Sequence, residues 1–344
     1  MSRVVGLYGL GSIGTSIANS LKEHGTGIAF AVDKDPRKAG KELASVGGPE
    51  GTGVVISEKL DPDAAKTSDV VLHSTGSRLS QVFPQIAELV EAGCSIISTC
   101  EELSYPYLKH PDLARKIDSM ARDCGVTVLG TGVNPGFLLD ALPMFICKAC
   151  RRVDSVQASR IVEASLRREP LQRKIGLGME TGEFEDRAKQ GLIGHIGLYE
   201  SCALIAEAMD WQLSEIRQEI SPVVADEEMK TSHFRIHKGQ VRGIRQEAVG
   251  TADGARIRLF LEMSVGAQEP GDSVEIQGEP PARLTIHGGL HGDLATVGRV
   301  LNSIEEVVAS PPGLATVLSL PLRLRKTNPI RQRPPELAGS ARLL

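Results

Sequence analysis

Residues 3–25 read RVVGLYGLGSIGTSIANSLKEHG, a short apolar run followed by three closely spaced glycines and a stretch with helical periodicity. The glycines form the pattern GxGxxG between the apolar run and the helix. In that context the first glycine permits a tight turn, the second admits a diphosphate to backbone N–H groups, and the third allows close packing. The stretch therefore predicts a dinucleotide-binding turn, whose cofactor contacts are Gly9, Gly11, Ser12, Ile13 and Gly14.

The second apolar run, residues 27–32, ends in an acid, Asp33. Its distance from Gly11 is close to the ~20 residues expected of an acid that binds the adenosine ribose. Asp33 favours NAD, because the 2′-phosphate of NADP would meet a like charge. Lys34 and Arg37 follow at once and can offset that repulsion, so the sequence also admits NADP.

Apolar runs and helical patterns alternate as far as about residue 150. Such alternation predicts βαβ units and a parallel sheet with helices on both faces. We expect an α/β protein whose Rossmann dinucleotide-binding domain spans residues 1–150 and is rejoined by a helix near residues 293–325. Ligands of such a sheet lie outside the carboxyl ends of its strands.

Beyond residue 150 longer and more polar alternating runs appear, at residues 153–163, 254–265 and 274–278. They predict a mixed or antiparallel sheet, interrupted by helices near residues 180–189, 195–209 and 293–309. We expect an α+β domain over residues 151–325. Residues 326–344 are rich in Pro and Arg and are expected to form a poorly packed tail.

Several polar residues follow strands of the predicted parallel sheet and are therefore candidates for ligand contacts. We expect cofactor contacts from Ser74, Thr75, Gly76, Thr99 and Asn134. The substrate pocket is expected to include Asn134, Pro135, Phe137 and His195. A turn with an N-cap explains Asn134 equally well, and simple packing explains His195 equally well. Asp293 is expected to cap the helix that follows it.

The segment SIISTCEELSYPY, residues 95–107, places two acids directly after a predicted buried strand. Thr99 and Glu102 fit a capping box, in which the threonine caps a helix and the glutamate folds back onto it. Alternatively, one carboxylate of Glu101 and Glu102 faces the cofactor and carries out acid–base chemistry. Pro106 makes any helix here short, so a stabilising cap alone is a weak reason for the pair.

Composition limits the classes of function. A net charge of −4 argues against a large nucleic-acid footprint, and no stretch approaches the ~18 apolar residues of a membrane helix. The six cysteines show no repeated spacing, which is typical of reduced thiols in a cytoplasmic protein. No set of His, Cys and carboxylate residues has metal-ligand spacing, so we expect no metal.

Four segments together resemble the 2,4-diaminopentanoate dehydrogenase family, which includes native NAD(P)-dependent amine dehydrogenases. They are STGS, IISTCEELSYP, GTGVNPGFLLDALP and GGLHGDLATVGRVLNSIEEVVASPPGLATVLSLPLR. The chain also resembles, more distantly, dihydrodipicolinate reductase and homoserine dehydrogenase. The family resemblance runs from residue 1 to about residue 325, and the last two segments carry most of its specificity.

The resemblance implies that residues 151–325 form a substrate and dimerisation domain and that the protein is a homodimer. It implies reversible oxidative deamination of an amine, with a ketone or aldehyde and ammonia on the other side. It also implies that a glutamate of the STCEEL segment is catalytic. Comparison with the TANKAL-type segment of homoserine dehydrogenases, which resemble one another in carrying a lysine there, ranks Glu102 first and Glu101 second.

Two rival functions stay open from the sequence. One is a dihydrodipicolinate reductase-like enzyme that reduces a C=N or C=O bond of a dicarboxylate, although the basic runs expected for diacid binding are absent. The other is a Rossmann protein that binds the dinucleotide without catalysis. An acid beside the nicotinamide distinguishes the enzymes from the binding protein.

Overall fold

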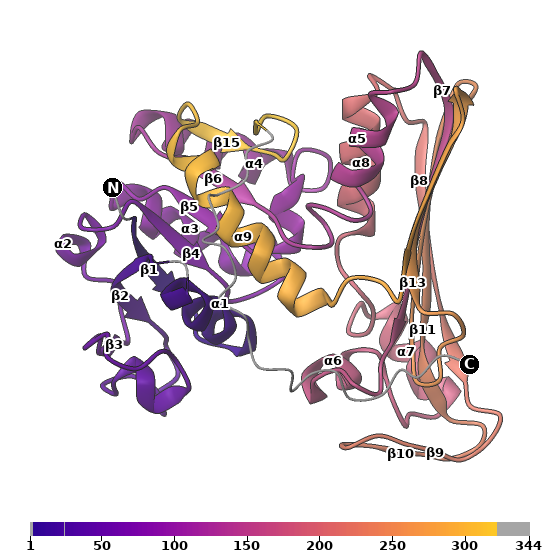
Figure 1. Ribbon diagram of the computed structural model, residues 1–344, viewed down its shortest axis with the longest axis horizontal. Coiled ribbons are helices and arrows are strands. Elements are labelled where there is room, and N and C mark those ends of the chain that lie inside the picture. The colour runs from indigo at the N-terminus through magenta and orange to yellow at the C-terminus, as the bar shows by residue number, and fades with distance from the viewer. Residues whose placement is uncertain (1–2, 24, 322–344) are drawn as a thin grey trace.

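The computed structural model describes residues 3–23 and 25–321, which form two sheets side by side (Figure 1). The first is a seven-stranded sheet whose paired strands all run parallel. In spatial order its strands are β15 (Gly313–Ala315), β6 (Thr127–Gly130), β5 (Ile96–Ser98), β4 (Val70–His73), β1 (Val4–Tyr8), β2 (Gly27–Val32) and β3 (Ile56–Ser57). The order 3-2-1-4-5-6 is that of a doubly wound dinucleotide-binding sheet.

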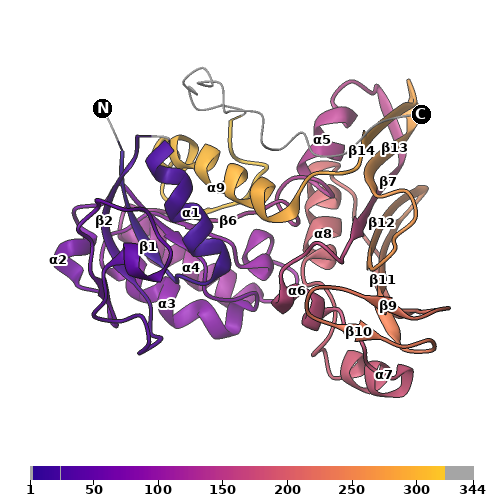
Figure 2. The same cartoon turned by 60° about the horizontal axis from the view of Figure 1, so that its bottom comes forward.

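Helices cover both faces of the parallel sheet. The helices α1 (Ser12–Glu23) and α9 (Gly292–Val308) pack together on one face, as Figure 2 shows. On the other face lie α3 (Leu79–Glu91) and α4 (Pro111–Asp123), and a short α2 (Pro62–Ala65) precedes β4. Within β4, Val71 faces the α3 and α4 side, whereas Val70 and Leu72 face the α1 and α9 side. Burial on both sides explains the nearly continuous apolar runs of these strands.

The second sheet has six strands and is mixed, because only β7 and β12 pair in parallel. In spatial order its strands are β14 (Ala282–His287), β13 (Gly271–Glu279), β7 (Arg152–Glu163), β12 (Ala255–Ser264), β11 (Val241–Ala252) and β8 (Glu215–Val224). Near one end lie the hairpin β9 (Met229–Lys230) and β10 (Arg235–Ile236) and the helices α6 (Glu169–Lys174) and α7 (Thr181–Lys189).

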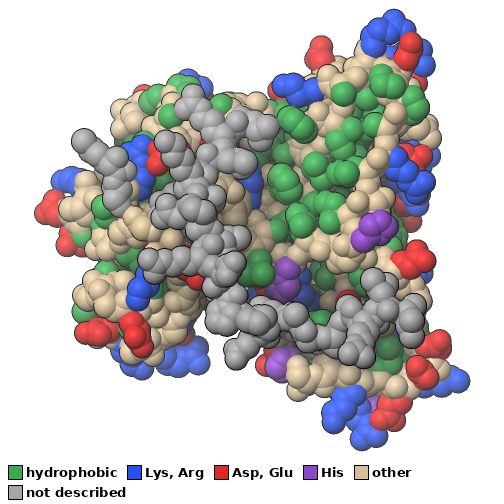
Figure 3. Space-filling model, in the orientation of Figure 1, with side chains coloured by type: hydrophobic (Ala, Val, Ile, Leu, Met, Phe, Trp, Pro, Cys, Tyr) green, Lys and Arg blue, Asp and Glu red, His purple; other side chains and the backbone are tan. Residues whose placement is uncertain are grey.

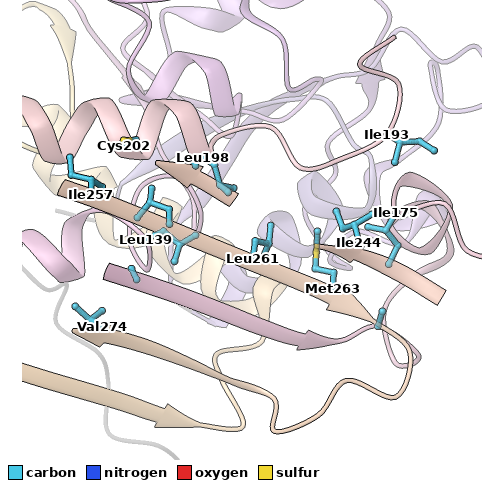
Figure 4. Close-up of a cluster of buried hydrophobic side chains, with 14 of the residues drawn as sticks. Leu139, Ile175, Ile193, Leu198, Cys202, Ile244, Ile257, Leu261, Met263 and Val274 are labelled. Atoms are coloured by element: carbon cyan, nitrogen blue, oxygen red, sulfur yellow. The ribbon is translucent and has the colours of Figure 1, made fainter. Parts of the chain in front are cut away.

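The core of the second region forms between its sheet and the helices α5 (Ala141–Cys147) and α8 (Leu198–Ala208). Figure 4 shows Leu198 and Cys202 of α8 above Ile257, Leu261 and Met263 of β12. These strand residues alternate with outward-facing Arg256 and Arg258, as expected for a sheet with one buried face. Figure 3 shows hydrophobic side chains gathered around α5, whose Phe145 is 58% exposed.

The predicted α/β class with a second α+β region is confirmed, while several local predictions need correction. Strands β8, β11, β14 and β15 were not anticipated from the sequence. His291, rather than Asp293, is the N-cap of α9 and accepts from the N–H of Leu294, because Asp293 is held by Arg167. The tail at 326–344 lies outside the described residues. The division into domains at residues 150 and 325 stays a prediction, although α9 and β15 return to the first sheet.

Candidate active site

Four parallel strands end in register at one edge of the first sheet. Tyr8 pairs with His73, His73 with Ser98, and Ser98 with Gly130. The segments that follow these strands therefore emerge side by side. They contain the glycine turn, Ser74–Gly76, Thr99 with the two glutamates, and Thr131–Pro135, which meets the sequence expectation that polar strand ends converge.

The three glycines of the turn occupy different surroundings. Gly9 has a φ of +93°, and a Cβ on Gly14 would lie 2.0 Å from the carbonyl oxygen of Gly9. A Cβ on Gly11 would meet nothing within 4 Å. Gly11 thus borders open space at the N-terminus of α1, where unpaired N–H groups and the helix dipole favour a phosphate. The turn fits a dinucleotide diphosphate.

Asp33 lies at the end of β2 beside the glycine turn. It accepts hydrogen bonds from the N–H of Leu10 at 2.9 Å, the N–H of Asp35 at 2.9 Å and Nζ of Lys38 at 2.8 Å. Burial opposes ionisation, but the bonds from Lys38 and the two N–H groups hold the pKa of Asp33 below its usual value. The cation that neutralises Asp33 is therefore Lys38, which the sequence analysis overlooked.

The two basic residues expected beside Asp33 are placed differently. Lys34 is exposed, and Arg37 makes an ion pair of 2.7 Å with Asp35 while its side chain stays 87% exposed. Neither lines the cavity described next.

A cavity of about 370 Å³ lies between the two sheets, outside the carboxyl ends of the parallel strands. The residues expected at the site that line it are Gly11, Ser12, Ile13, Ser74, Thr75, Gly76, Thr99, Glu101, Asn134, Pro135 and His195. The Ser74 hydroxyl donates to the carbonyl oxygen of Gly9 at 2.9 Å and so joins two of the strand-end turns. Phe137 does not line the cavity, in contrast to the sequence expectation.

Of the two adjacent glutamates, Glu101 is the one that lines this cavity. It opens the short 3₁₀ helix η2 (Glu101–Ser104), its side chain is 20% exposed, and Nζ of Lys174 lies 3.9 Å from its carboxylate. Burial raises the pKa of Glu101 above its usual value, although the positive charge of Lys174 acts in the opposite direction. A carboxyl group tuned upward in a cleft is suited to acid–base work near neutral pH.

Glu102 does not line the cavity and is 2% exposed. Its carboxylate accepts from the N–H of Leu79 at 2.8 Å, from Nζ of Lys109 at 2.7 Å and, at 2.9 Å, lies against Nε2 of His110. Burial opposes its ionisation, but the Lys109 and Leu79 bonds lower the pKa of Glu102 below its usual value. Glu102 thus stabilises the N-terminus of α3. This geometry argues against the sequence-based ranking of Glu102 ahead of Glu101 as the catalytic residue.

The capping box expected over Thr99–Glu102 is wrong. The residue before η2 is Cys100, whose side chain makes no capping hydrogen bond. Glu102 cannot fold back onto Thr99 because its oxygens are bound to α3 and to the segment before α4. Thr99 instead lines the cavity.

Asn134 and His195 meet at the cavity wall. Nε2 of His195 lies 3.0 Å from Nδ2 of Asn134 and 3.1 Å from its backbone oxygen. Burial, assisted by the charges of Lys174 and Arg160, lowers the pKa of His195 to about 3, so its imidazole is neutral. Oδ1 of Asn134 is buried and has no hydrogen-bond partner among the described residues. It is an acceptor placed for a ligand donor.

A cationic wall from the second region completes the cavity, and it was visible in the sequence only as scattered basic residues. Arg160 pairs with Asp272 at 3.2 Å, and Arg167 pairs with Asp293 at 2.9 Å. Arg168 reaches the same Asp293 at 3.4 Å. The sequence analysis missed Lys174 altogether as a cavity residue. Its only signal is weak: it lies on the short α6 near Leu171, which also lines the cavity.

Among the described residues, no group of three or more His, Cys, Asp or Glu could hold a metal ion. In the same part of the chain no helix has the length and apolar character needed to cross a membrane. The six cysteines are free thiols, and Cys147 packs into the second core.

The parallel sheet, its glycine turn and the crevice facing a second sheet define a dinucleotide-binding α/β protein with a cleft beside the cofactor turn. The sequence model of the 2,4-diaminopentanoate dehydrogenase C-terminal domain matches residues 137–333. A 2,4-diaminopentanoate dehydrogenase from Acetoanaerobium sticklandii is 32% identical over 330 residues, 92% of this chain and 92% of that protein. This chain therefore belongs to the 2,4-diaminopentanoate dehydrogenase family, as its sequence segments suggested.

Two further relatives support the whole-chain match. An amine dehydrogenase from Streptomyces virginiae is 23% identical over 349 residues, covering 92% of this chain and 96% of that protein. The solved structure of an amine dehydrogenase from Mycobacterium smegmatis superposes with a TM-score of 0.84 at 22% identity, covering 95% of this chain and 98% of that one. At this identity the structure establishes the shared fold.

Proposed function

We propose that this chain is an NAD(P)-dependent amine dehydrogenase that interconverts an amine with a ketone or aldehyde and ammonium. The observation that carries the proposal is the position of Glu101. Its carboxyl group, with a raised pKa, lines the crevice between the glycine turn and the second sheet. A protein that only binds a dinucleotide has no need of an ionisable acid at that place.

We propose Glu101 as the catalytic acid and base, with Glu102 as a structural support. In the amination direction Glu101 takes a proton from ammonium, returns protons as water leaves the carbinolamine, and stabilises the iminium by its charge. Such help is typically worth ~10²–10⁴ in rate. The bound dinucleotide supplies the hydride that reduces the iminium carbon. Neutral His195 orients Asn134, whose free Oδ1 can accept from the carboxamide of the nicotinamide or from the substrate.

We propose that the dinucleotide is held by residues from five strand ends. The diphosphate contacts Gly11, Ser12 and Ile13, whereas Gly9 and Gly14 shape the turn beneath them. The remaining contacts come from Asp33, Ser74, Thr75, Gly76, Thr99 and Asn134.

Asp33 favours NAD through the ribose hydroxyls, and the Lys38 ion pair makes NADP acceptable by neutralising the carboxylate. Lys34, exposed beside Asp33, contributes at most a distant charge.

The cationic wall suggests the class of substrate. Arg160, Arg167 and Arg168 face only two paired carboxylates, and Nε of Arg167 and of Arg168 donates no hydrogen bond to any described residue. We propose that this surplus positive charge binds a carboxylate, so that the substrate is an amino acid bearing a second amine rather than a simple alkylamine. The name of the Acetoanaerobium sticklandii relative agrees with this chemistry.

The test is oxidation of NADH and of NADPH with a panel of amino-substituted keto acids and simple ketones, with and without ammonium. Consumption that needs ammonium supports the amine dehydrogenase. Consumption without ammonium would identify the rival C=O reductase, which an arginine wall also suits. Binding of NADH without turnover of any ketone would support the other rival, a protein that binds the dinucleotide without catalysis.

The homodimer and the cytoplasmic location stay predictions. The exposed hydrophobic side chains around α5 support an interface, because such patches on a protein surface commonly mark contact sites. Light scattering during size-exclusion chromatography measures the mass and decides the oligomeric state.

A further inference from the structure

A second cavity, of about 540 Å³, adjoins the first. The two share Ser77, Lys174 and His195 as common wall. The far side of the second cavity is lined by exposed residues, among them Leu192 and Glu219, so it opens to solvent. It thus gives a route between bulk water and the wall behind the site of Glu101.

One acid on this wall is buried although it lies on the cavity. Glu200 belongs to the apolar helix α8 and is 1% exposed. Its Oε1 has no hydrogen-bond partner among the described residues, and Nζ of Lys109 lies 3.8 Å from it. The same Nζ donates to Glu102 at 2.7 Å, so Lys109 is committed to the other acid. Oε1 of Glu200 is therefore a buried acceptor at the cavity wall that no described hydrogen-bond donor fills.

The charges around Glu200 come from several elements. Burial, opposed by the charge of Lys109 and assisted by the charges of Glu102 and Glu101 of η2, raises the pKa of Glu200 to about 7. Arg78 before α3, Lys174 of α6 and Glu219 of β8 line the same cavity. Glu200 can hold or release a proton near neutral pH while Glu102, held by Lys109, stays ionised.

The chemistry of amine formation requires such a group. A ketone, ammonium, the reduced dinucleotide and a proton give an alkylammonium ion, the oxidised dinucleotide and water. Each amination thus consumes a proton beyond the four on ammonium, and each deamination releases it. Glu101 lines the crevice that the dinucleotide and the substrate would fill, so it needs another path for that proton.

We propose that Glu200 is the proton-relay group that exchanges this proton between Glu101 and solvent through the second cavity. The inference rests on the proposed amine dehydrogenase function. Ser77, which lines both cavities, and cavity water complete the path. No bond to carbon changes at Glu200, where an O–H bond forms in one step and breaks in the next.

The test compares Glu200→Gln with Glu200→Asp and with Glu219→Gln, a matched control on an exposed acid of the same cavity. In dilute buffer at pH 7, Glu200→Gln should lower kcat by about tenfold or more, with the KM of the ketone nearly unchanged. Imidazole at rising concentration should restore kcat, because a small buffer enters the open cavity and carries the proton. Glu200→Asp should retain most of the rate, and Glu219→Gln should behave as wild type.

A second readout is independent of turnover. Potentiometric titration of wild type minus Glu200→Gln should show the loss of a group that binds a proton near neutrality. Wild-type kcat for Glu200→Gln in dilute buffer would overturn the relay, and so would a low kcat that imidazole does not raise. Failure of wild type itself to oxidise NADH or NADPH with ammonium would instead refute the proposed function.

Discussion

Glu101 and Glu102 are adjacent in the chain, yet their carboxylates lie in different environments. That of Glu101 lines the crevice beside the glycine turn, and that of Glu102 is bound by Lys109 and the N-terminus of α3. Burial raises the pKa of Glu101, whereas the bonds to Glu102 overcome burial and lower its pKa. Glu101 is thus placed for acid–base chemistry in the crevice, whereas Glu102 is placed for structural support.

Glu101→Gln should lower kcat by about 10²-fold or more while cofactor affinity and thermal stability stay near wild type, because only the ionisable group is lost. Glu102→Gln is the matched variant. It should retain kcat but lower the free energy of unfolding by about 1–3 kcal/mol, because Lys109 loses its charged partner. Steady-state kinetics and thermal melts measure both, and the reverse pattern would return Glu102 to the catalytic role.

The stabilisation by Glu102 should depend on pH. Its folded-state pKa is lowered, so its contribution is present above the unfolded-state pKa of about 4.3 and is lost as pH falls through the folded value. The difference in free energy of unfolding between wild type and Glu102→Gln should therefore shrink as the solution is acidified below about pH 4.5. Denaturant titrations at several pH values check this, and a constant difference would contradict it.

Alanine substitutions at two glycines of the turn should have different effects, one on cofactor binding and the other on stability. Gly11→Ala should fold normally, since its Cβ meets nothing within 4 Å, but should weaken NADH binding about tenfold or more by entering the diphosphate space. Gly14→Ala should lower the free energy of unfolding by about 1–3 kcal/mol, since its Cβ would lie 2.0 Å from the oxygen of Gly9. Calorimetry and fluorescence titration separate the outcomes, and equal NADH affinity in Gly11→Ala and wild type would be inconsistent with this site.

Lys38 should govern the use of NADP. Lys38→Met leaves Asp33 with an uncompensated charge, so kcat/KM for NADPH relative to NADH should fall about tenfold, equivalent to about 1.4 kcal/mol. Arg37→Ala is the control, because Arg37 pairs with Asp35 instead. If Arg37→Ala shifts the preference between NADPH and NADH and Lys38→Met does not, then Arg37, as the sequence suggested, is the cation that offsets the charge of Asp33.

Arg168→Gln should raise the KM of a carboxylate-bearing amine about tenfold or more with little change in kcat, because a ground-state contact is lost. Arg168 is the suitable position since its side chain is 33% exposed, whereas Arg160 is buried in an ion pair. An alkylamine of equal length without the carboxylate serves as the control substrate. Equal effects on both substrates would argue against a carboxylate site.

Much of the cofactor end was predictable because its residues are close in sequence. The glycine turn and Asp33 belong to one βαβ unit, and local spacing is enough to place them. The sequence also predicted that Ser74, Thr99 and Asn134 would lie near one another, because parallel strands end at a common edge of the sheet. The partner of Asp33 was not predictable, since Lys34, Arg37 and Lys38 all lie within five residues of it in sequence.

The cationic wall and Glu200 had faint signals. Arg160 lies in a strand and Arg167 and Arg168 follow it, but a pattern of charges does not tell which face is turned to the first sheet. Glu200 stands within the apolar run LYESCALIAEA, where an acid is unusual and merits notice.

By itself the sequence determined the family, the doubly wound sheet, the glycine turn and the presence of an acid pair at a strand end. The sheet, the turn and the acid pair follow from periodicity and spacing, which act over a few residues, whereas the family follows from the resemblance of four segments. Only the tertiary structure decided which acid enters the crevice, which lysine neutralises Asp33 and which arginines face the ligand. Those choices depend on desolvation and on charges that folding brings within 4 Å, such as Lys174, which is distant in the chain from Glu101.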